Sequence, residues 1–216
     1  MRLEAITWER LTDALADRLL KTGPRDGGSR LRVGLDGAPA AGTGRPADAL
    51  GHALRLRGRP SAVVSTEGFL RPASLRYEYG RQDPDAYYGR WYDTGALWRE
   101  VFAPLDPGGS GRVLPDLWDP ATDRATRSEP VELPPGGVLL LHGPLLLGQW
   151  FPFDLTVHLD VSPGALHRLT PPADRWTLPA FERYAADTDP RAAADVVVRA
   201  DRPDHPAWTG LPDAGR

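Results

Sequence analysis

The sequence predicts an α/β domain built on a parallel sheet of about five strands. The first third of the chain alternates between a helical pattern, a strand, a glycine-rich loop, a second helix and a second strand, which is typical of parallel sheets. Further along, three apolar runs have the length and composition of buried strands. No repeat or composition shift divides the 216 residues, so we expect a single domain over residues 1–216. Residues 1–28 would form its N-terminal helix and loop, and residues 202–216 a proline-rich tail.

The first elements follow from local patterns in chain order. Leu3–Lys21 has apolar residues at helical spacing and is followed by Gly-Pro, so it predicts a helix. Leu31–Asp36 is a strand pattern, and the loop Gly37–Gly44 follows it. Pro46–Leu56 predicts a helix with proline in its first turn, and Ser61–Ser65 predicts the next strand.

The rest of the chain is less regular. Residues 67–120 are rich in aromatic and turn residues, with one helix expected at Thr94–Phe102. Residues 166–179 are expected to be irregular, and a helix is expected at Ala180–Ala186. The three remaining strands are expected at Val138–Leu141, Asp154–Val161 and Ala194–Ala200.

Composition excludes several classes of function. The net charge of −3 gives no reason to expect nucleic acid or an anionic membrane as a partner. The absence of cysteine excludes disulfides, thiolate catalysis and cysteine-bound metal, and we expect no metal site. No apolar run approaches the ~20 residues that cross a bilayer, and no signal-type segment follows Met1, so we expect a cytoplasmic protein. Lys21 is the single lysine, so any role that requires lysine falls on it or is absent.

The glycine loop has the frame of a phosphate-binding loop without its functional side chains. Such a P-loop needs glycines so that backbone N–H groups surround the phosphates, a lysine for the β/γ oxygens and a Ser/Thr hydroxyl for Mg²⁺. Gly37 and Gly42 have the right spacing between a strand and a helix. Thr43, however, stands at the lysine position and Gly44 at the hydroxyl position. A plain glycine-rich turn would give the same pattern.

A wider set of landmarks resembles bacterial uridine-kinase-like proteins, from about residue 30 to about residue 205. The resemblance implies a P-loop nucleoside-kinase-like fold with helices on both faces of the sheet. It also implies an ancestral transfer of a phosphoryl group from a nucleoside triphosphate to a hydroxyl. In chain order the landmarks are Arg32–Gly37, Glu67–Pro72, Asp83–Tyr88 with Trp91–Asp93, Val138–Gly143 and Asp189–Val198.

Three departures from the family pattern fall on one reaction centre. The lysine and the magnesium hydroxyl are missing, and His142 stands where the family has an acidic residue. Each lost charged or donor group typically costs ~3–4 kcal/mol of transition-state stabilisation. Arg45 could replace the lysine only with an insertion, Lys21 only by an unusual approach, and Thr43 could serve Mg²⁺ only if the loop shifted by one residue. We therefore interpret the loop as degenerate.

Glu67 and His142 are the candidate catalytic residues. The family has an acidic residue at the position of Glu67 that implies a base for the attacking hydroxyl, although a solvated loop carboxylate would look the same. His142 follows a central strand at the edge where open α/β sheets hold ligands, and it could pair with Glu67 as acid and base. A structural histidine is the alternative.

The substrate-side candidates come from the aromatic segment and a region that acts as a lid in the family. The aromatic rings suit a pocket wall for a flat or hydrophobic ligand, but they could equally form core. The carboxylates match family positions near the substrate sugar, but they could be helix caps. The candidates are Asp85, Tyr87, Tyr88, Trp91, Asp93 and Arg168.

The leading hypothesis is a repurposed uridine-kinase-like protein that binds a small organic molecule in the former kinase crevice. A further hypothesis is that Glu67 and His142 carry out acid–base chemistry on that molecule. One alternative is an active kinase with a non-standard loop, which alone would use ATP and Mg²⁺ as cofactors. The other alternative is a non-enzymatic interaction module that uses the aromatic residues as a protein contact.

Overall fold

A single seven-stranded sheet forms the centre of the computed structural model, which describes residues 2–211. The strand order is β1-β11-β10-β9-β2-β8-β3. The five strands from β10 to β3 are parallel, and β11 and β1 are antiparallel additions at one edge. The strands are β1 (Glu4–Ala5), β2 (Leu31–Asp36), β3 (Ser61–Ser65), β8 (Val138–Gly143), β9 (Leu155–Asp160), β10 (Val196–Arg199) and β11 (Ala207–Trp208).

The prediction of a parallel α/β sheet is confirmed, but the prediction of five strands is wrong. All five predicted strands form the parallel part of the sheet. The two additional strands, β1 and β11, have two residues each and pair with each other, so neither has a pattern of its own to recognise. Strand β11 lies within the predicted tail 202–216, whose last five residues, like Met1, lie outside the described residues.

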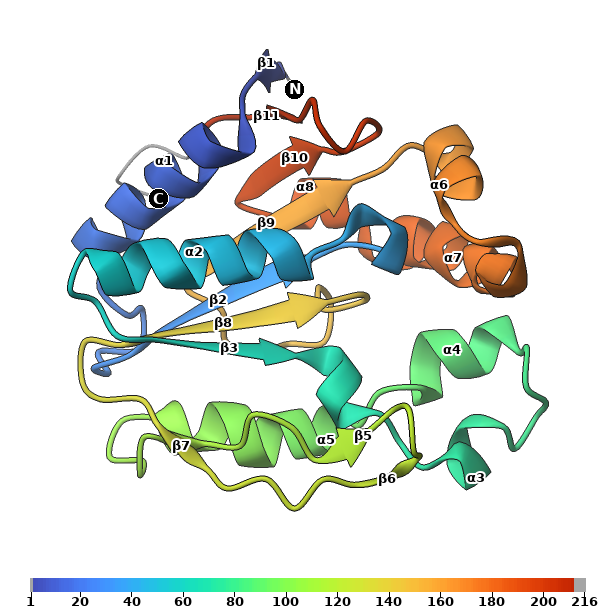
Figure 1. Cartoon of the computed structure of the whole chain (residues 1–216), viewed down its shortest axis with the longest axis horizontal. Coiled ribbons are helices and arrows are strands. Elements are labelled where there is room, and N and C mark those ends of the chain that lie inside the picture. Colours follow the sequence, from blue (N-terminus) through green and yellow to red (C-terminus); the bar gives the residue numbers. More distant parts are fainter. Residues whose placement is uncertain (1, 212–216) are drawn as a thin grey trace.

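Helices cover both faces of the sheet, as the resemblance implied. Helices α1 (Trp8–Lys21) and α2 (Gly44–Leu56) lie side by side across one face. Helix α5 (Thr94–Leu97), extended by a π-helical turn over Trp98–Phe102, covers the other (Figure 1). Within residues 2–211, no helix combines the length and the apolarity that crossing a bilayer requires.

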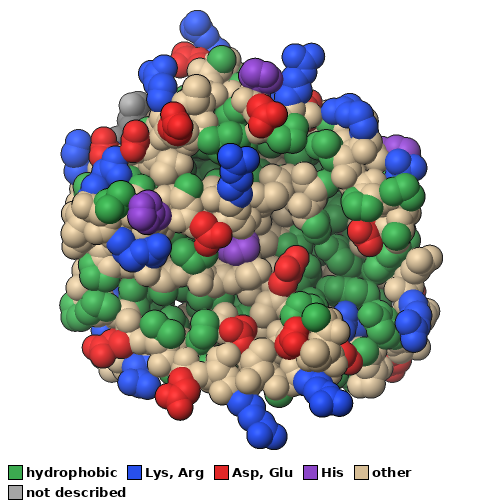
Figure 2. Space-filling model, in the orientation of Figure 1, with side chains coloured by type: hydrophobic (Ala, Val, Ile, Leu, Met, Phe, Trp, Pro, Cys, Tyr) green, Lys and Arg blue, Asp and Glu red, His purple; other side chains and the backbone are tan. Residues whose placement is uncertain are grey.

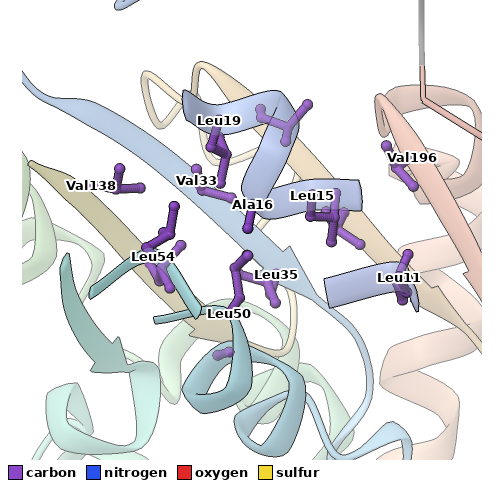
Figure 3. Close-up of a cluster of buried hydrophobic side chains, with 14 of the residues drawn as sticks. Leu11, Leu15, Ala16, Leu19, Val33, Leu35, Leu50, Leu54, Val138 and Val196 are labelled. Atoms are coloured by element: carbon purple, nitrogen blue, oxygen red, sulfur yellow. The ribbon is translucent and has the colours of Figure 1, made fainter. Parts of the chain in front are cut away.

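Side-chain alternation along the strands divides the core into two layers. Successive strand residues face opposite sides of a sheet. Val33 and Leu35 therefore face α1 and α2 together with Leu140, and Leu139 and Leu141 face α5. All five are at most 1 % exposed. Figure 3 shows Leu15 and Leu19 of α1 and Leu50 and Leu54 of α2 around the first layer.

The shorter elements gather at the carboxyl end of the parallel strands, toward which the arrowheads in Figure 1 point. They include α3 (Ala73–Arg76), α4 (Pro84–Arg90), α6 (Pro163–Leu169), α7 (Leu178–Thr188) and α8 (Pro190–Ala193). Two small two-stranded antiparallel sheets pair β4 (Arg112–Val113) with β7 (Val131–Glu132) and β5 (Trp118–Asp119) with β6 (Arg124–Ala125).

The prediction that residues 166–179 are irregular is wrong. Helix α6 ends at Leu169, and a 3-10 helix spans Pro172–Thr177 before α7 begins. Pro163 and Pro172 occupy the first turns of these two helices, where the missing N–H of proline costs nothing. Proline therefore starts helices in this region.

Candidate functional site

The glycine loop leads from the carboxyl end of β2 into the amino end of α2. The Gly37 N–H donates to the carbonyl oxygen of Gly143 at 3.2 Å, which ties the start of the loop to β8. A short 3-10 helix, Pro39–Ala41, follows, and Gly42 closes it with a φ of 66°. This left-handed conformation favours glycine, so the second framing glycine has a backbone reason to be there.

His142 occupies the space beside the start of α2. Its Nδ1 lies 3.3 Å from the Thr43 hydroxyl oxygen. A Cβ atom added at Gly44 would lie 3.3 Å from Cε1 of the same ring. Burial lowers the pKa of His142, against the opposing effect of the Asp48 and Glu67 carboxylates, so the ring is neutral at neutral pH. The hydroxyl position of a P-loop thus faces an uncharged imidazole.

The side chains present do not fit a magnesium-bound triphosphate. Lys21 is the last residue of α1 and lies near Pro60 and Gly136, which precede β3 and β8. It is therefore at the amino ends of the strands, whereas the loop is at their carboxyl ends. Arg45 is exposed and lines a separate hollow between α1 and α2. Within the described residues, the loop therefore has neither an ammonium group at the lysine position nor an unengaged hydroxyl for a metal.

A crevice of about 330 Å³ lies between the glycine loop, the segment after β3, helix α4 and the residues before α7. Figure 2 shows hydrophobic side chains gathered in a hollow between α7 and α4. Two carboxylates, Glu67 and Asp174, line the crevice, and its lining within residues 2–211 includes no lysine or arginine. The lining residues are Ala38, Pro39, Ala40, Glu67, Leu70, Tyr87, Trp91, Tyr92, Pro120, Thr170, Pro171, Asp174, Trp176, Thr177 and Phe181.

Three of the predicted site residues, Glu67, Tyr87 and Trp91, line this crevice. Tyr87 and Trp91 both line the crevice and belong to a buried hydrophobic cluster. Tyr87 is 5 % exposed and makes edge-to-face contacts with Trp176 and Phe181, at centroid distances of 5.6 and 5.8 Å. Burial raises the pKa of Tyr87 to about 12, so its hydroxyl stays protonated.

Asp85 and Tyr88 lie outside the crevice and interact with α7. The Asp85 side chain is 84 % exposed and pairs with Arg183 at 2.9 Å. The Tyr88 hydroxyl donates to Asp187 at 3.3 Å, and the Arg183 guanidinium lies over the Tyr88 ring. These contacts join α4 to α7.

Asp93 and Arg168 also lie outside the lining. Asp93 caps α5 by accepting a hydrogen bond from the Ala96 N–H at 2.8 Å, and Arg168 donates to the Asp201 carbonyl at 3.1 Å. His142 does not line the crevice either, and no hydrogen bond joins it to Glu67 among the described residues.

Sequence reasoning missed the contribution of the segment before α7. Thr170, Asp174 and Trp176 line the crevice, and Phe181 follows on α7. Arg168 was the one candidate that the sequence offered in this region. The segment itself offers one acidic and one aromatic residue, Asp174 and Trp176. Two such residues do not indicate a pocket wall unless the positions of the neighbouring elements are known.

Comparisons with known proteins place the fold. No protein-family model and no curated protein matches the chain. A solved structure of a possible uridine kinase from Bacillus stearothermophilus superposes with a TM-score of 0.70 at 24% identity, covering 86% of this chain and 96% of that one. A candidate fructose transport system kinase from Silicibacter sp. TM1040 gives 0.57 at 25%, covering 87% and 92%. A D-glycerate 3-kinase from Cryptococcus neoformans gives 0.53 at 15%, covering 83% and 79%. The chain has a uridine-kinase-like P-loop kinase fold, which confirms the resemblance drawn from the sequence.

Proposed function

We propose that this chain binds a small, uncharged or cationic organic molecule in the crevice beside the glycine loop, and does not hold ATP in the manner of a kinase. The observation that carries the proposal is the pairing of a loop without phosphate-binding side chains with a crevice that has two carboxylates and no cation.

The charge of the crevice argues against phosphate or carboxylate groups on the ligand. Burying an anion next to the Glu67 and Asp174 carboxylates adds repulsion to the cost of desolvation. A hydroxyl or amino group of the ligand would instead donate to Glu67. The faces of Trp91 and Trp176 would contact a flat or apolar body.

An active kinase with an unusual loop is the second candidate, because the three solved structures named above carry kinase names and the possible uridine kinase superposes over most of both chains. Under this alternative, the protein would bind ATP tightly only in the presence of Mg²⁺. We assign no acid–base reaction to Glu67 and His142, because they share no hydrogen bond within the described residues and only Glu67 lines the crevice.

Calorimetric titration with uridine, fructose and glycerate tests the proposal without ATP. We expect uridine to bind best, because it is uncharged and has a flat base and hydroxyl donors. Glu67→Gln should weaken uridine binding about tenfold or more, since a hydrogen bond to a charged group contributes roughly 1.5–3 kcal/mol. Glu129→Gln, which changes an exposed glutamate outside the lining, is the matched control. Tightest binding of the anion glycerate, or a uridine affinity that Glu67→Gln does not alter, would contradict the proposal.

A further inference from the structure

A second and larger cavity lies on the other side of Phe181. It has a volume of about 580 Å³ and is bounded by the carboxyl end of β9 and by helices α6, α7 and α8. Of the residues that the structure describes, only Ala38 and Phe181 line both this cavity and the crevice, so the two spaces share one wall. Its volume is within the range of small-molecule sites, roughly 300–1,000 Å³.

A buried carboxylate–imidazole pair forms the floor of this cavity. Asp36 ends β2 and His158 lies on β9, and the two residues are direct partners in the parallel register. Both side chains therefore face the same side of the sheet, and His158 Nδ1 lies 2.6 Å from an Asp36 carboxylate oxygen. The Leu146 N–H donates to the other carboxylate oxygen at 2.8 Å. Asp36 is 0 % exposed and His158 7 % exposed.

This geometry fixes which nitrogen of His158 is available. The Asp36 carboxylate engages Nδ1, so Nε2 is the ring nitrogen that is left for a ligand. Among residues 2–211, the ring forms its one side-chain hydrogen bond through Nδ1, and none through Nε2. The His158 side chain lines the cavity, so a ligand there can reach it.

The remaining walls determine the chemistry of the ligand. Asp160 pairs with Arg199 at 2.7 Å and with Arg191 at 3.5 Å, and Arg199 also pairs with Asp201 at 3.5 Å, so these four charged groups are engaged with one another. Leu166 and Leu178 are apolar parts of the lining. An uncharged and largely apolar ligand suits these walls better than an ion.

We propose that this cavity is a second binding site for an uncharged, mainly apolar molecule that carries one hydroxyl or N–H group, which donates to Nε2 of His158. The site is independent of the ligand proposed for the crevice, since its polar contact is His158 and that of the crevice is Glu67.

Two matched probes, 4-ethylphenol and its methyl ether 4-ethylanisole, test this site in the full-length protein. They differ in the hydrogen-bond donor. We expect the phenol to bind about tenfold or more tightly than the ether, a ratio that corresponds to one good hydrogen bond. In ¹⁵N spectra of the imidazoles, the phenol should shift the Nε2 signal of His158. His158→Phe should abolish the preference, and His52→Phe on exposed α2 surface should keep it.

The spectrum of the unmodified protein decides the matter even if His158→Phe does not fold. Equal or tighter binding of the ether, an Nε2 signal that does not move at saturation, or no binding of either probe at millimolar concentration would overturn the proposal. A folded His158→Phe variant that still prefers the phenol would do the same.

Discussion

Restoring the missing P-loop side chains should restore magnesium-dependent ATP binding only when His142 is replaced as well. The Cβ atom of any residue at position 44 would lie 3.3 Å from the His142 ring, closer than the roughly 3.5–4.0 Å of ordinary carbon contacts. A serine introduced there would meet the imidazole before it met a metal ion. We therefore expect Thr43→Lys combined with Gly44→Ser to bind ATP little better than the original protein.

Adding His142→Asp should change the outcome. The carboxylate is smaller than the imidazole and supplies an oxygen ligand of the kind that Mg²⁺ prefers. Two restored charge-assisted contacts at roughly 1.5 kcal/mol or more each predict at least about a hundredfold gain in affinity for ATP. Isothermal titration with and without Mg²⁺ measures the gain. The control is the same triple variant with alanine at position 44, which lacks the hydroxyl. If the double variant equals the triple variant, or if the original protein already binds as tightly, the argument from His142 is refuted.

Three further results are expected from denaturant unfolding. Because burial lowers the pKa of His142, the unfolded chain binds more protons just below pH 6.5, so stability falls as the pH drops from 7.5 to 5. His142→Asn should reduce that slope by up to about 1.4 kcal/mol per pH unit, and an unchanged slope would count against a buried neutral ring. Leu140→Ala should cost about 2–5 kcal/mol, whereas Leu56→Ala, at a side chain that is 73 % exposed, should cost less than about 0.5 kcal/mol; equal costs would contradict the layering of the core. Gly143→Ala should destabilise by more than about 1 kcal/mol, because φ is 149° and its Cβ would collide with a neighbouring side chain, whereas Gly23→Ala meets nothing within 4 Å.

The sheet was predictable from sequence because four of its five parallel strands, β2, β8, β9 and β10, are largely buried. Val138–Leu141 in β8 and the valines of β10 form continuous apolar segments. Segments of this kind are typical of strands in the interior of a parallel sheet. Strands β1 and β11 were not predictable, because two-residue strands are defined by their partners and not by their own residues.

The crevice was predictable only on the side where motifs mark it. Glu67, Tyr87 and Trp91 lie in segments with recognisable family landmarks, and they line the crevice. Asp174 and Trp176 approach it from a segment whose prolines concealed a 3-10 helix, so their position depends on packing.

The contact between Asp36 and His158 shows the limit of sequence reasoning most clearly. The two residues are 122 positions apart, and each lies within an ordinary strand pattern. They meet because β2 and β9 are neighbours in one particular register, and no local feature specifies that register.

Phosphorus NMR of ATP and Mg²⁺ with the original protein tests the central claim most directly. The claim is that the loop from Gly37 to Gly44 does not hold a triphosphate for transfer. We predict that the γ-phosphate signal keeps its position and intensity when the protein is added, also in the presence of uridine. A magnesium-dependent shift of that signal, or its loss as a new phosphate ester appears, would contradict the account.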